Sequence, residues 1–310
     1  MKITVIKDFT EELIPTSIWS IYTKEYKLLP ENVIRVTELI GSPLKRKLLR
    51  ENYENISRRT TNFHYQIMGI MIHSLLELKE FQDVLSEMKK AEMLNDEKML
   101  LLQAKKLLHL KERKQMELEM GNWRIVGEFD LFEDEIIYDY KVTSEFVITH
   151  EKFDKYEKQL QIYRYMLEKK EGIKVKAIKN VFLLRDFSPL RSKLPSPLVI
   201  VEYPIWEDSK VEEFIAQRLK LHESQPYCSD EDMMLRINYI VGNKRFSDED
   251  RAKEYAKRVG KEVVKEVIPL GCLYFCEVAD FCPQWHIMKE KKIKEFINLM
   301  KKGGDKNESR

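Results

Sequence analysis

The sequence predicts an α/β fold, and the order of segments in the middle of the chain supports this assignment. Trp123 to Leu131 and Glu135 to Val142 are rich in aliphatic, aromatic and β-branched residues, which is typical of strands. A helical spacing of apolar residues runs from about Lys152 to Lys170. Two further strand-like segments follow, at Lys174 to Leu184 and at Leu198 to Tyr203. Helices and strands that alternate along one chain indicate an α/β arrangement.

The neighbouring segments complete this pattern. The acidic stretch 132–134 is so short that the strands on either side of it are predicted to pair as an antiparallel hairpin. Apolar residues are dense from Tyr65 to Lys79, so we expect a helix that is buried on most sides, and helical spacing returns over 82–112. Ser42-Pro43 is a predicted helix start, because Ser caps helices and Pro suits their first turn. A further helix is predicted near Ser209 to His222.

These segments suggest four regions. We expect a mainly helical N-terminal section over 1–60, a core over 61–226, a cysteine-bounded C-terminal appendage over 227–290, and a charged helix end with a disordered tail over 291–310. The appendage has its own strand-like patch, at Ile237 to Val241, and a helix-like patch, at Asp248 to Arg258.

Composition narrows the class of protein. The chain has 310 residues, of which 43% are hydrophobic and 34% charged, as expected for an ordered globular protein with a charged surface. The first residues lack the apolar run of a signal peptide, and no later run is long enough for a membrane span, so we expect a cytoplasmic location without a membrane partner. The formal net charge is only +2, so composition alone does not predict nucleic-acid binding.

Asp130, Asp139 and Lys141 form the first candidate site. Side chains alternate along a strand, so Asp139 and Lys141 share one face, and the predicted hairpin can bring Asp130 onto it. Charges in an otherwise apolar strand are costly unless they are paired or bind a metal. Carboxylates could hold Mg²⁺ or Mn²⁺, and Lys141 could stabilise negative charge during phosphodiester hydrolysis. The alternative is an ordinary ion pair between Asp139 and Lys141.

Two helices add polar residues to this set. Gly69, His73 and Glu77 are spaced four residues apart on one helix face, where the glycine would permit close approach of another element and the histidine offers a nitrogen ligand. Gln159 and Tyr163 lie one turn apart on the helix after the hairpin. A core histidine and an ordinary amphipathic helix are the simpler alternatives.

Taken together, the order Gly69-x3-His73, Gly127-x2-Asp130, Asp139-x-Lys141 and Gln159-x3-Tyr163 resembles the RecB-like branch of the PD-(D/E)XK nuclease superfamily. The resemblance covers roughly residues 60 to 205. It implies a mixed central sheet flanked by helices and one metal site. The roles it implies are metal ligation by His73, Asp130, Asp139 and the backbone carbonyl of Tyr140, catalysis by Lys141, and positioning of the lysine or of DNA by Gln159 and Tyr163.

The function that this resemblance implies is a metal-dependent DNA nuclease. The chain is similar to stand-alone nucleases of phage and bacterial genomes, which implies an exonuclease in DNA repair, recombination or replication, with DNA and a helicase, recombinase or single-strand-binding protein as partners. One alternative is a catalytically silent DNA-binding or scaffold module on the same fold. Another is a metal-free structural protein in which the hairpin charges form surface ion pairs.

The four cysteines suggest a second metal site. Cys272-x3-Cys276-x5-Cys282 lies near the C-terminal end, and Cys228 could fold back beside it as a fourth ligand. Four thiolates suit an iron-sulfur cluster, here 4Fe-4S, or a structural Zn²⁺, while buried free cysteines are the simpler alternative. Several RecB-like nucleases are similar in holding the end of the nuclease domain with such a cluster, although one of their cysteines normally precedes the core.

Overall fold

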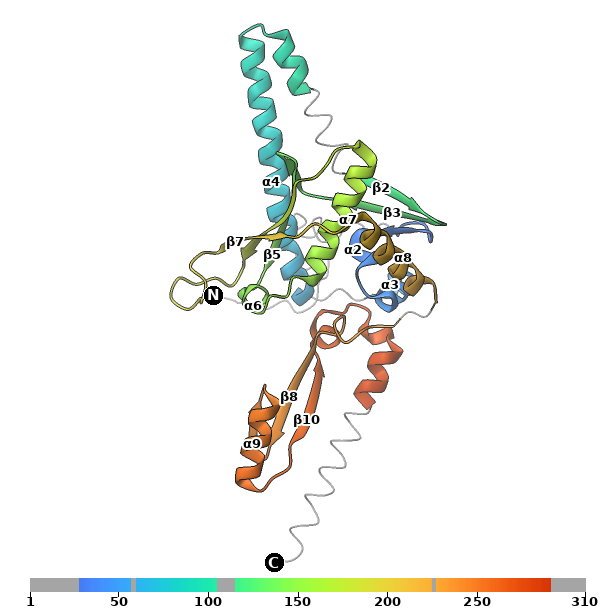
Figure 1. The fold of residues 1–310 in the computed structure, drawn as a ribbon, viewed down its shortest axis with the longest axis vertical. Helices are drawn as coiled ribbons and strands as arrows, with labels where there is room; N and C mark the ends of the chain where they lie inside the picture. The colour runs from blue at the N-terminus through green and yellow to red at the C-terminus, as the bar shows by residue number, and fades with distance from the viewer. Residues whose placement is uncertain (1–27, 57–59, 105–114, 225–226, 291–310) are drawn as a thin grey trace, which may run out of the picture. The chain divides into compact units, whose positions relative to one another are not determined.

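The fold is described from a computed structural model, which covers residues 28–56, 60–104, 115–224 and 227–290 (Figure 1). In the helix Thr60–Met93, the backbone is described but the side chains of 60–66, 74, 76–78 and 80–81 are not. The chain divides into two compact units: unit 1 combines Met1–Ile40 with Thr60–Ser224, and unit 2 combines Gly41–Arg59 with Gln225–Arg310. The predicted N-terminal section 1–60 thus contributes to both units. The predicted tail 291–310 lies outside the described residues.

Unit 1 contains two sheets. The larger has the order β4-β5-β6-β7, and only β5 and β6 run parallel, so the sheet is mixed. The smaller has the order β1-β3-β2, in which β1 is parallel and β2 antiparallel to β3. The strands are β1 (Val33–Arg35), β2 (Gln115–Met120), β3 (Trp123–Glu128), β4 (Leu131–Glu133), β5 (Ile136–Thr143), β6 (Ala177–Leu184) and β7 (Leu198–Tyr203).

The hairpin differs from the prediction. The segment from Trp123 is not one strand up to Leu131: it ends at Glu128 and pairs with β2 in the smaller sheet, while the short β4 pairs with β5. Asp134 and Glu135 adopt positive φ angles of 50° and 63°, which a two-residue turn needs if its twist is to match that of the strands. The tight turn therefore joins β4 to β5, and the chain bends between β3 and β4 at Asp130.

Helices flank these sheets, as predicted. Unit 1 has α2 (Val36–Leu39), α4 (Thr60–Met93), α6 (Glu145–Thr149), α7 (Asp154–Glu171) and α8 (Asp208–Ser224), and residues 97–104 are also helical. Helix α7 is the most buried: nine consecutive residues, Gln159 to Leu167, lie inside the protein. It ends at Gly172, whose φ of 67° suits the left-handed conformation of a helix cap.

The prediction that the helix over Tyr65 to Lys79 is buried on most sides is wrong. Helix α4 contacts β5, but Ile70, Met71 and Leu75 are 38%, 51% and 61% exposed. One face of a long helix is enough to contact a strand, so dense apolar spacing does not require burial all round.

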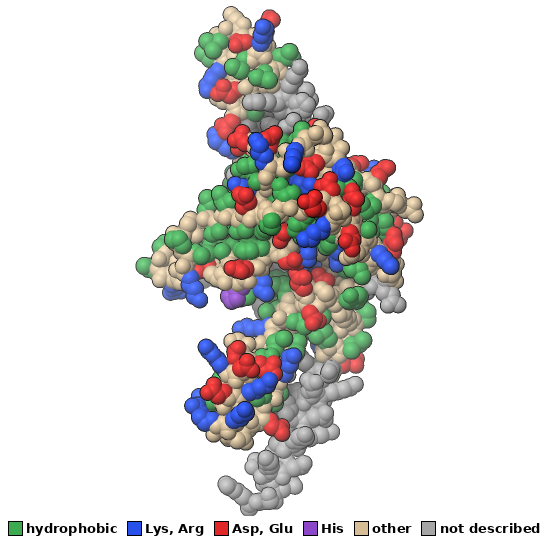
Figure 2. All heavy atoms as spheres, in the orientation of Figure 1, with side chains coloured by type: hydrophobic (Ala, Val, Ile, Leu, Met, Phe, Trp, Pro, Cys, Tyr) green, Lys and Arg blue, Asp and Glu red, His purple; other side chains and the backbone are tan. Residues whose placement is uncertain are grey.

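On the face shown in Figure 2, hydrophobic side chains gather over β7, where Leu198 and Ile200 are about half exposed.

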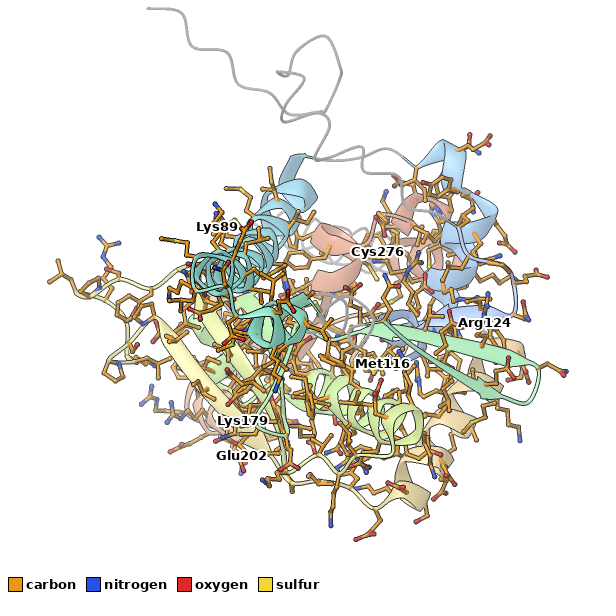
Figure 3. The ribbon with its side chains drawn as sticks, turned by 90° about the horizontal axis from the view of Figure 1, so that it is seen from above. Lys89, Met116, Arg124, Lys179, Glu202 and Cys276 are labelled. Carbon is orange, nitrogen blue, oxygen red and sulfur yellow. The ribbon has the colours of Figure 1, made fainter. Side chains whose placement is uncertain are left out.

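The core of unit 1 lies between the sheets, α7 and α8. Its fully buried members include Ile34 of β1, Phe129 before β4, Ile137 of β5 and Leu160 of α7. On β6 and β7, Lys179 and Glu202 face each other with a 2.9 Å ion pair (Figure 3). Because side chains alternate along a strand, the next residue of β6, Asn180, lies on the opposite face, which packs against the core.

Unit 2 combines a helix near the N-terminus with the C-terminal part of the chain. Its elements are α3 (Pro43–Glu51), a 3-10 turn (Tyr53–Asn55), strands β8 (Leu235–Val241), β9 (Lys244–Phe246) and β10 (Val264–Pro269) in the order β10-β8-β9, helix α9 (Glu249–Val259), and short helical turns at Gly271–Phe275 and Ala279–Phe281. Ser42 caps α3 by accepting a hydrogen bond from the Lys45 amide, which confirms the predicted helix start. Leu44 and Leu48 of α3 pack with Val278 and Cys282.

A search of the described residues for a membrane-spanning helix finds none that is both long and apolar enough.

Candidate active site

Strand β5 carries two of the predicted site residues. Asp139 and Lys141 share the face of β5 that points into the protein, as alternation along a strand predicts. The Asp139 residue is only 3% exposed, and the Lys141 Nζ lies 2.6 Å from its Oδ2. Burial of the Asp139 carboxylate costs desolvation energy that fully exposed pairs do not pay, whereas the Lys141 side chain is 21% exposed. The pair therefore has a buried acid and a partly exposed lysine, unlike the surface ion pair considered from the sequence.

Asp130 reaches β5 from the bend between β3 and β4. Its Oδ2 accepts a hydrogen bond of 2.6 Å from the backbone amide of Tyr140, the residue between Asp139 and Lys141. Its Oδ1 lies 2.8 Å from Nδ1 of His73 on α4. Helix α4, the bend before β4 and strand β5 thus bring His73, Asp130, Asp139 and Lys141 together, and α4 is distant in sequence from the other two.

The contact between His73 and Asp130 determines which ring nitrogen of the histidine carries the proton. A carboxylate accepts hydrogen bonds, so Nδ1 of His73 carries a proton and the lone pair of the neutral ring lies on Nε2. The hydrogen bond to Asp130 raises the pKa of His73 above its usual value, although partial burial opposes this effect. A histidine held in this way is typical of metal sites, where a carboxylate fixes the tautomer and leaves the other nitrogen as the ligand.

The two carboxylates influence each other. Burial raises the pKa of Asp139, the positive charge of Lys141 opposes this rise, and the negative charge of Asp130 adds to it. Burial is the largest of these effects, and the charge of Asp130 is a smaller one. A bound cation would oppose both, because a positive ion beside a carboxylate favours its ionised form.

Gln159 and Tyr163 of α7 are both buried and contact each other. The Gln159 amide donates a 2.8 Å hydrogen bond to the Tyr163 hydroxyl, and burial raises the pKa of Tyr163 well above its usual range. Within the described residues, Gln159 makes no hydrogen bond to Lys141 or Asp139. A Cβ on Gly127 would lie 2.7 Å from the Tyr163 ring, so the glycine is what lets this ring pack against β3.

Gly69 of α4 does not have the expected role. Nothing described lies within 4 Å of the Cβ position on Gly69, so no close approach of another element is seen there. The expectation rested on spacing along the helix, which does not show whether a partner is present. The side chain of Glu77 lies outside the described residues.

One polar neighbour of the site was missed from the sequence. Asn180 of β6 is fully buried, lies opposite Asp139 in the parallel ladder, and donates to its Oδ2 at 2.8 Å. A single asparagine within the apolar strand of 177–184 gives no sign of its partner until the register of the strands is known. The only signal in the sequence was its polarity.

A groove with a volume of about 360 Å³ adjoins the Tyr163 side of the site. Gly127 of β3 and Tyr163 of α7 line this groove and also pack against each other, so the groove begins where α7 meets β3. Its lining is Arg35, Val36, Thr37, Gln115, Met116, Glu117, Val126, Gly127, Glu128 and Tyr163.

The donor atoms fit a divalent cation, but they do not form a closed ligand set. Within the described part of the chain, no three histidine, cysteine, aspartate or glutamate side chains form a group arranged to hold a metal ion. His73 and Lys141 instead each contact one carboxylate. Carboxylate oxygens and an imidazole nitrogen are suitable ligands for Mg²⁺ or Mn²⁺. Ligation by these side chains and by the Tyr140 carbonyl remains a prediction.

The four cysteines all lie in unit 2 and form no disulfide. Burial raises the pKa of Cys272 to about 12, with smaller contributions from Cys276, Cys228 and Cys282, so these three cysteines lie near enough to affect Cys272. The Cys228 Sγ lies 2.9 Å from the hydroxyl of Ser42, which also caps α3. Thiols are suitable ligands for an iron-sulfur cluster or zinc, but no three of these described cysteines are arranged to hold a metal ion, and binding of either remains a prediction.

The comparisons with known proteins are weak. No protein-family model matches the chain, and no curated protein matches it either. Among solved structures, the chain is similar to a protein named SSO0001, with 15% identity and a TM-score of 0.35 over 68% of this chain and 84% of that one. It is also similar to a protein from Eubacterium rectale described as a candidate exonuclease, with 12% identity and a TM-score of 0.37 over 66% of this chain and 90% of that one. Similarity at this level does not identify a family.

Proposed function

We propose that the protein is a metal-dependent DNA nuclease of the RecB-like PD-(D/E)XK type. The observation that carries this proposal is the meeting of Asp130, Asp139, Lys141 and His73 at one point of the mixed sheet. Two carboxylates, one of them buried, and an imidazole can hold a divalent cation, and a primary amine can stabilise the negative charge that develops in phosphodiester hydrolysis. The order of these residues in the sequence adds support, because it matches the motif order of that nuclease branch.

Each residue of the candidate site has a proposed role in metal binding or in phosphodiester hydrolysis. Asp130, Asp139, Nε2 of His73 and the Tyr140 carbonyl would hold Mg²⁺ or Mn²⁺. When bound, the ion would polarise a phosphate and lower the pKa of water. Lys141 would stabilise the negative charge that develops on the phosphate, or orient the attacking water. Gln159 and Tyr163, held together by their own hydrogen bond, would support the groove side of the site.

Exonuclease action in DNA repair, recombination or replication is the finer form of this proposal. It rests on the resemblance in sequence alone. The proposal that a helicase, recombinase or single-strand-binding protein is a partner has the same basis. Binding of a 4Fe-4S cluster or zinc by Cys228, Cys272, Cys276 and Cys282 is likewise a proposal, supported by the four free thiols in one unit.

The test is DNA cleavage by protein purified without oxygen, which protects any cluster. Linear and circular duplex DNA and single-stranded DNA are incubated with Mn²⁺, with Mg²⁺ or with a chelator, using the wild-type chain and Asp139→Ala. We expect metal-dependent loss of linear DNA by the wild type and an activity at least about 100-fold lower in the variant. Survival of the circular DNA would identify an exonuclease. Equal inactivity of both proteins, with DNA binding intact, would replace the proposal by the silent DNA-binding module.

A further inference from the structure

Asn180 makes two hydrogen bonds to the same residue of the candidate site. Its Nδ2 donates to the Oδ2 of Asp139 at 2.8 Å and to the backbone carbonyl of Asp139 at 3.1 Å. Both partners are acceptors, so the nitrogen of the amide must face Asp139 and the amide cannot be reversed. One side chain on β6 therefore holds both the carboxylate and the main chain of Asp139.

This orientation leaves the other end of the amide unsatisfied. Asn180 is fully buried, and its Oδ1 has no hydrogen-bond partner among the described residues. A buried acceptor without a partner destabilises a fold, and such groups are rare in proteins. An apolar residue would suit this position better if packing were its only role. The unsatisfied oxygen is a cost that the two hydrogen bonds from Nδ2 to Asp139 offset, so those bonds are the favourable polar contacts of this side chain.

The two donors on Asp139 also distinguish its two oxygens. Oδ2 receives both Asn180 Nδ2 and Lys141 Nζ, at 2.8 Å and 2.6 Å, whereas Oδ1 has no hydrogen-bond partner within the part of the chain that the structure describes. Lys141 is the donor that the proposed reaction would use elsewhere, on water or on the phosphate. Asn180 is neutral and buried, so its hydrogen bond can remain when Lys141 moves.

We propose that Asn180 is a positioning residue that holds Asp139 through Oδ2 and the backbone carbonyl, so that Oδ1 is presented to a divalent cation. This inference rests on the proposed metal site. Partners that orient a metal ligand in this way change metal affinity about 10- to 100-fold when they are removed. Asn180 does not touch the substrate in this account, and its effect passes entirely through Asp139.

The test is the Mn²⁺ concentration that gives half-maximal DNA cleavage, together with the Mn²⁺ dissociation constant measured by calorimetry. The variants are Asn180→Ala and Asn180→Leu, the second of which keeps the number and branching of the side-chain heavy atoms but donates no hydrogen bond. Asn238→Ala is the matched control, because Asn238 is a buried strand asparagine that donates to a carboxylate, Glu266, in unit 2. Circular dichroism establishes the temperature at which each variant is folded, and the assays are run there.

We expect both Asn180 variants to weaken Mn²⁺ binding at least about tenfold and to raise the half-maximal concentration by a similar factor. The Asn238→Ala control should lose stability without this change. If Asp139→Ala abolishes metal-dependent cleavage but the Asn180 variants keep wild-type Mn²⁺ affinity, the inference about Asn180 is wrong and the proposed function stands. If the wild type neither binds Mn²⁺ nor cleaves DNA, both are wrong.

Discussion

The carboxylate of Asp130 accepts a hydrogen bond from the backbone amide of Tyr140. This bond attaches the bend before β4 to the middle of β5, and it places one carboxylate beside the pair formed by Asp139 and Lys141. The site therefore depends on how the bend is held as well as on the strand. Substitutions that displace the bend or its neighbours should impair cleavage even where they leave every charged side chain intact.

Gly127→Ala tests the packing beside this bend. The added Cβ would lie 2.7 Å from the Tyr163 ring and 2.9 Å from the Val36 side chain, and both contacts are too short, so both side chains must shift. We expect a loss of about 1–3 kcal/mol in the free energy of unfolding, as in other overpacked cores. Cleavage should fall as well, because Tyr163 moves. Denaturant unfolding and the cleavage assay measure the two effects.

Gly69→Ala is the control for that substitution. Nothing described surrounds the Cβ position on Gly69, and alanine favours a helix interior, so this change should stabilise α4 by about 0.5–1 kcal/mol. A variant at Gly69 as damaged as the one at Gly127 would contradict the packing described for both glycines.

His73→Gln tests the contact with Asp130 through its pH dependence. In metal-free protein, the pKa of His73 is raised above 6.5 by the hydrogen bond to Asp130, so the protonated ring stabilises the folded state. This stabilisation is fully present below the unfolded pKa and is lost as the pH rises through the higher folded pKa. With a chelator present, the stability difference between wild type and variant should therefore be largest below pH 6.5 and should decrease as the pH rises through the raised pKa of His73. In an Asp130→Asn background the same comparison should lose most of its pH dependence.

Cys276→Ser tests the proposed metal in unit 2. Four thiolates that hold a metal couple its binding to folding, so anaerobic wild-type protein should contain about four iron atoms or about one zinc per chain, and the variant should contain less. Elemental analysis and thermal unfolding measure the two consequences. Wild-type protein without iron or zinc, and equal in stability to the variant, would favour four buried free cysteines.

The sequence predicted elements well where one strong periodicity governs them. The strand at Leu198–Tyr203 was located correctly, and the helix predicted over Lys152 to Lys170 is α7, at Asp154–Glu171. It also placed Asp139 and Lys141 on one face, because alternation follows from strand geometry alone. These are local properties, which neighbouring residues along the chain determine.

The contacts that the sequence did not predict join residues on different segments of the chain. The segment from Trp123 pairs with β2, at Gln115–Met120. Apolar and polar residues alternate along β2 as in a strand, but this local pattern does not show which strand is its partner. Asn180 could be assigned to Asp139 only from the parallel register of β5 and β6, and that register depends on the crossover through α7. The contact of Ser42 with Cys228 spans 186 positions, and no periodicity in the sequence predicts it.

Comparison of Lys141→Ala with Lys179→Ala tests whether Lys141 belongs to a metal-dependent nuclease site. The two lysines lie on adjacent strands of one sheet and each pairs with a carboxylate, but Lys179 pairs with Glu202 and is not adjacent to Asp139 in the strand register (Figure 3). The measurement is the rate of Mn²⁺-dependent degradation of linear DNA. We expect Lys141→Ala to be slower than wild type by at least about 100-fold and Lys179→Ala to stay within about threefold. Equal rates for the two variants would contradict this expectation.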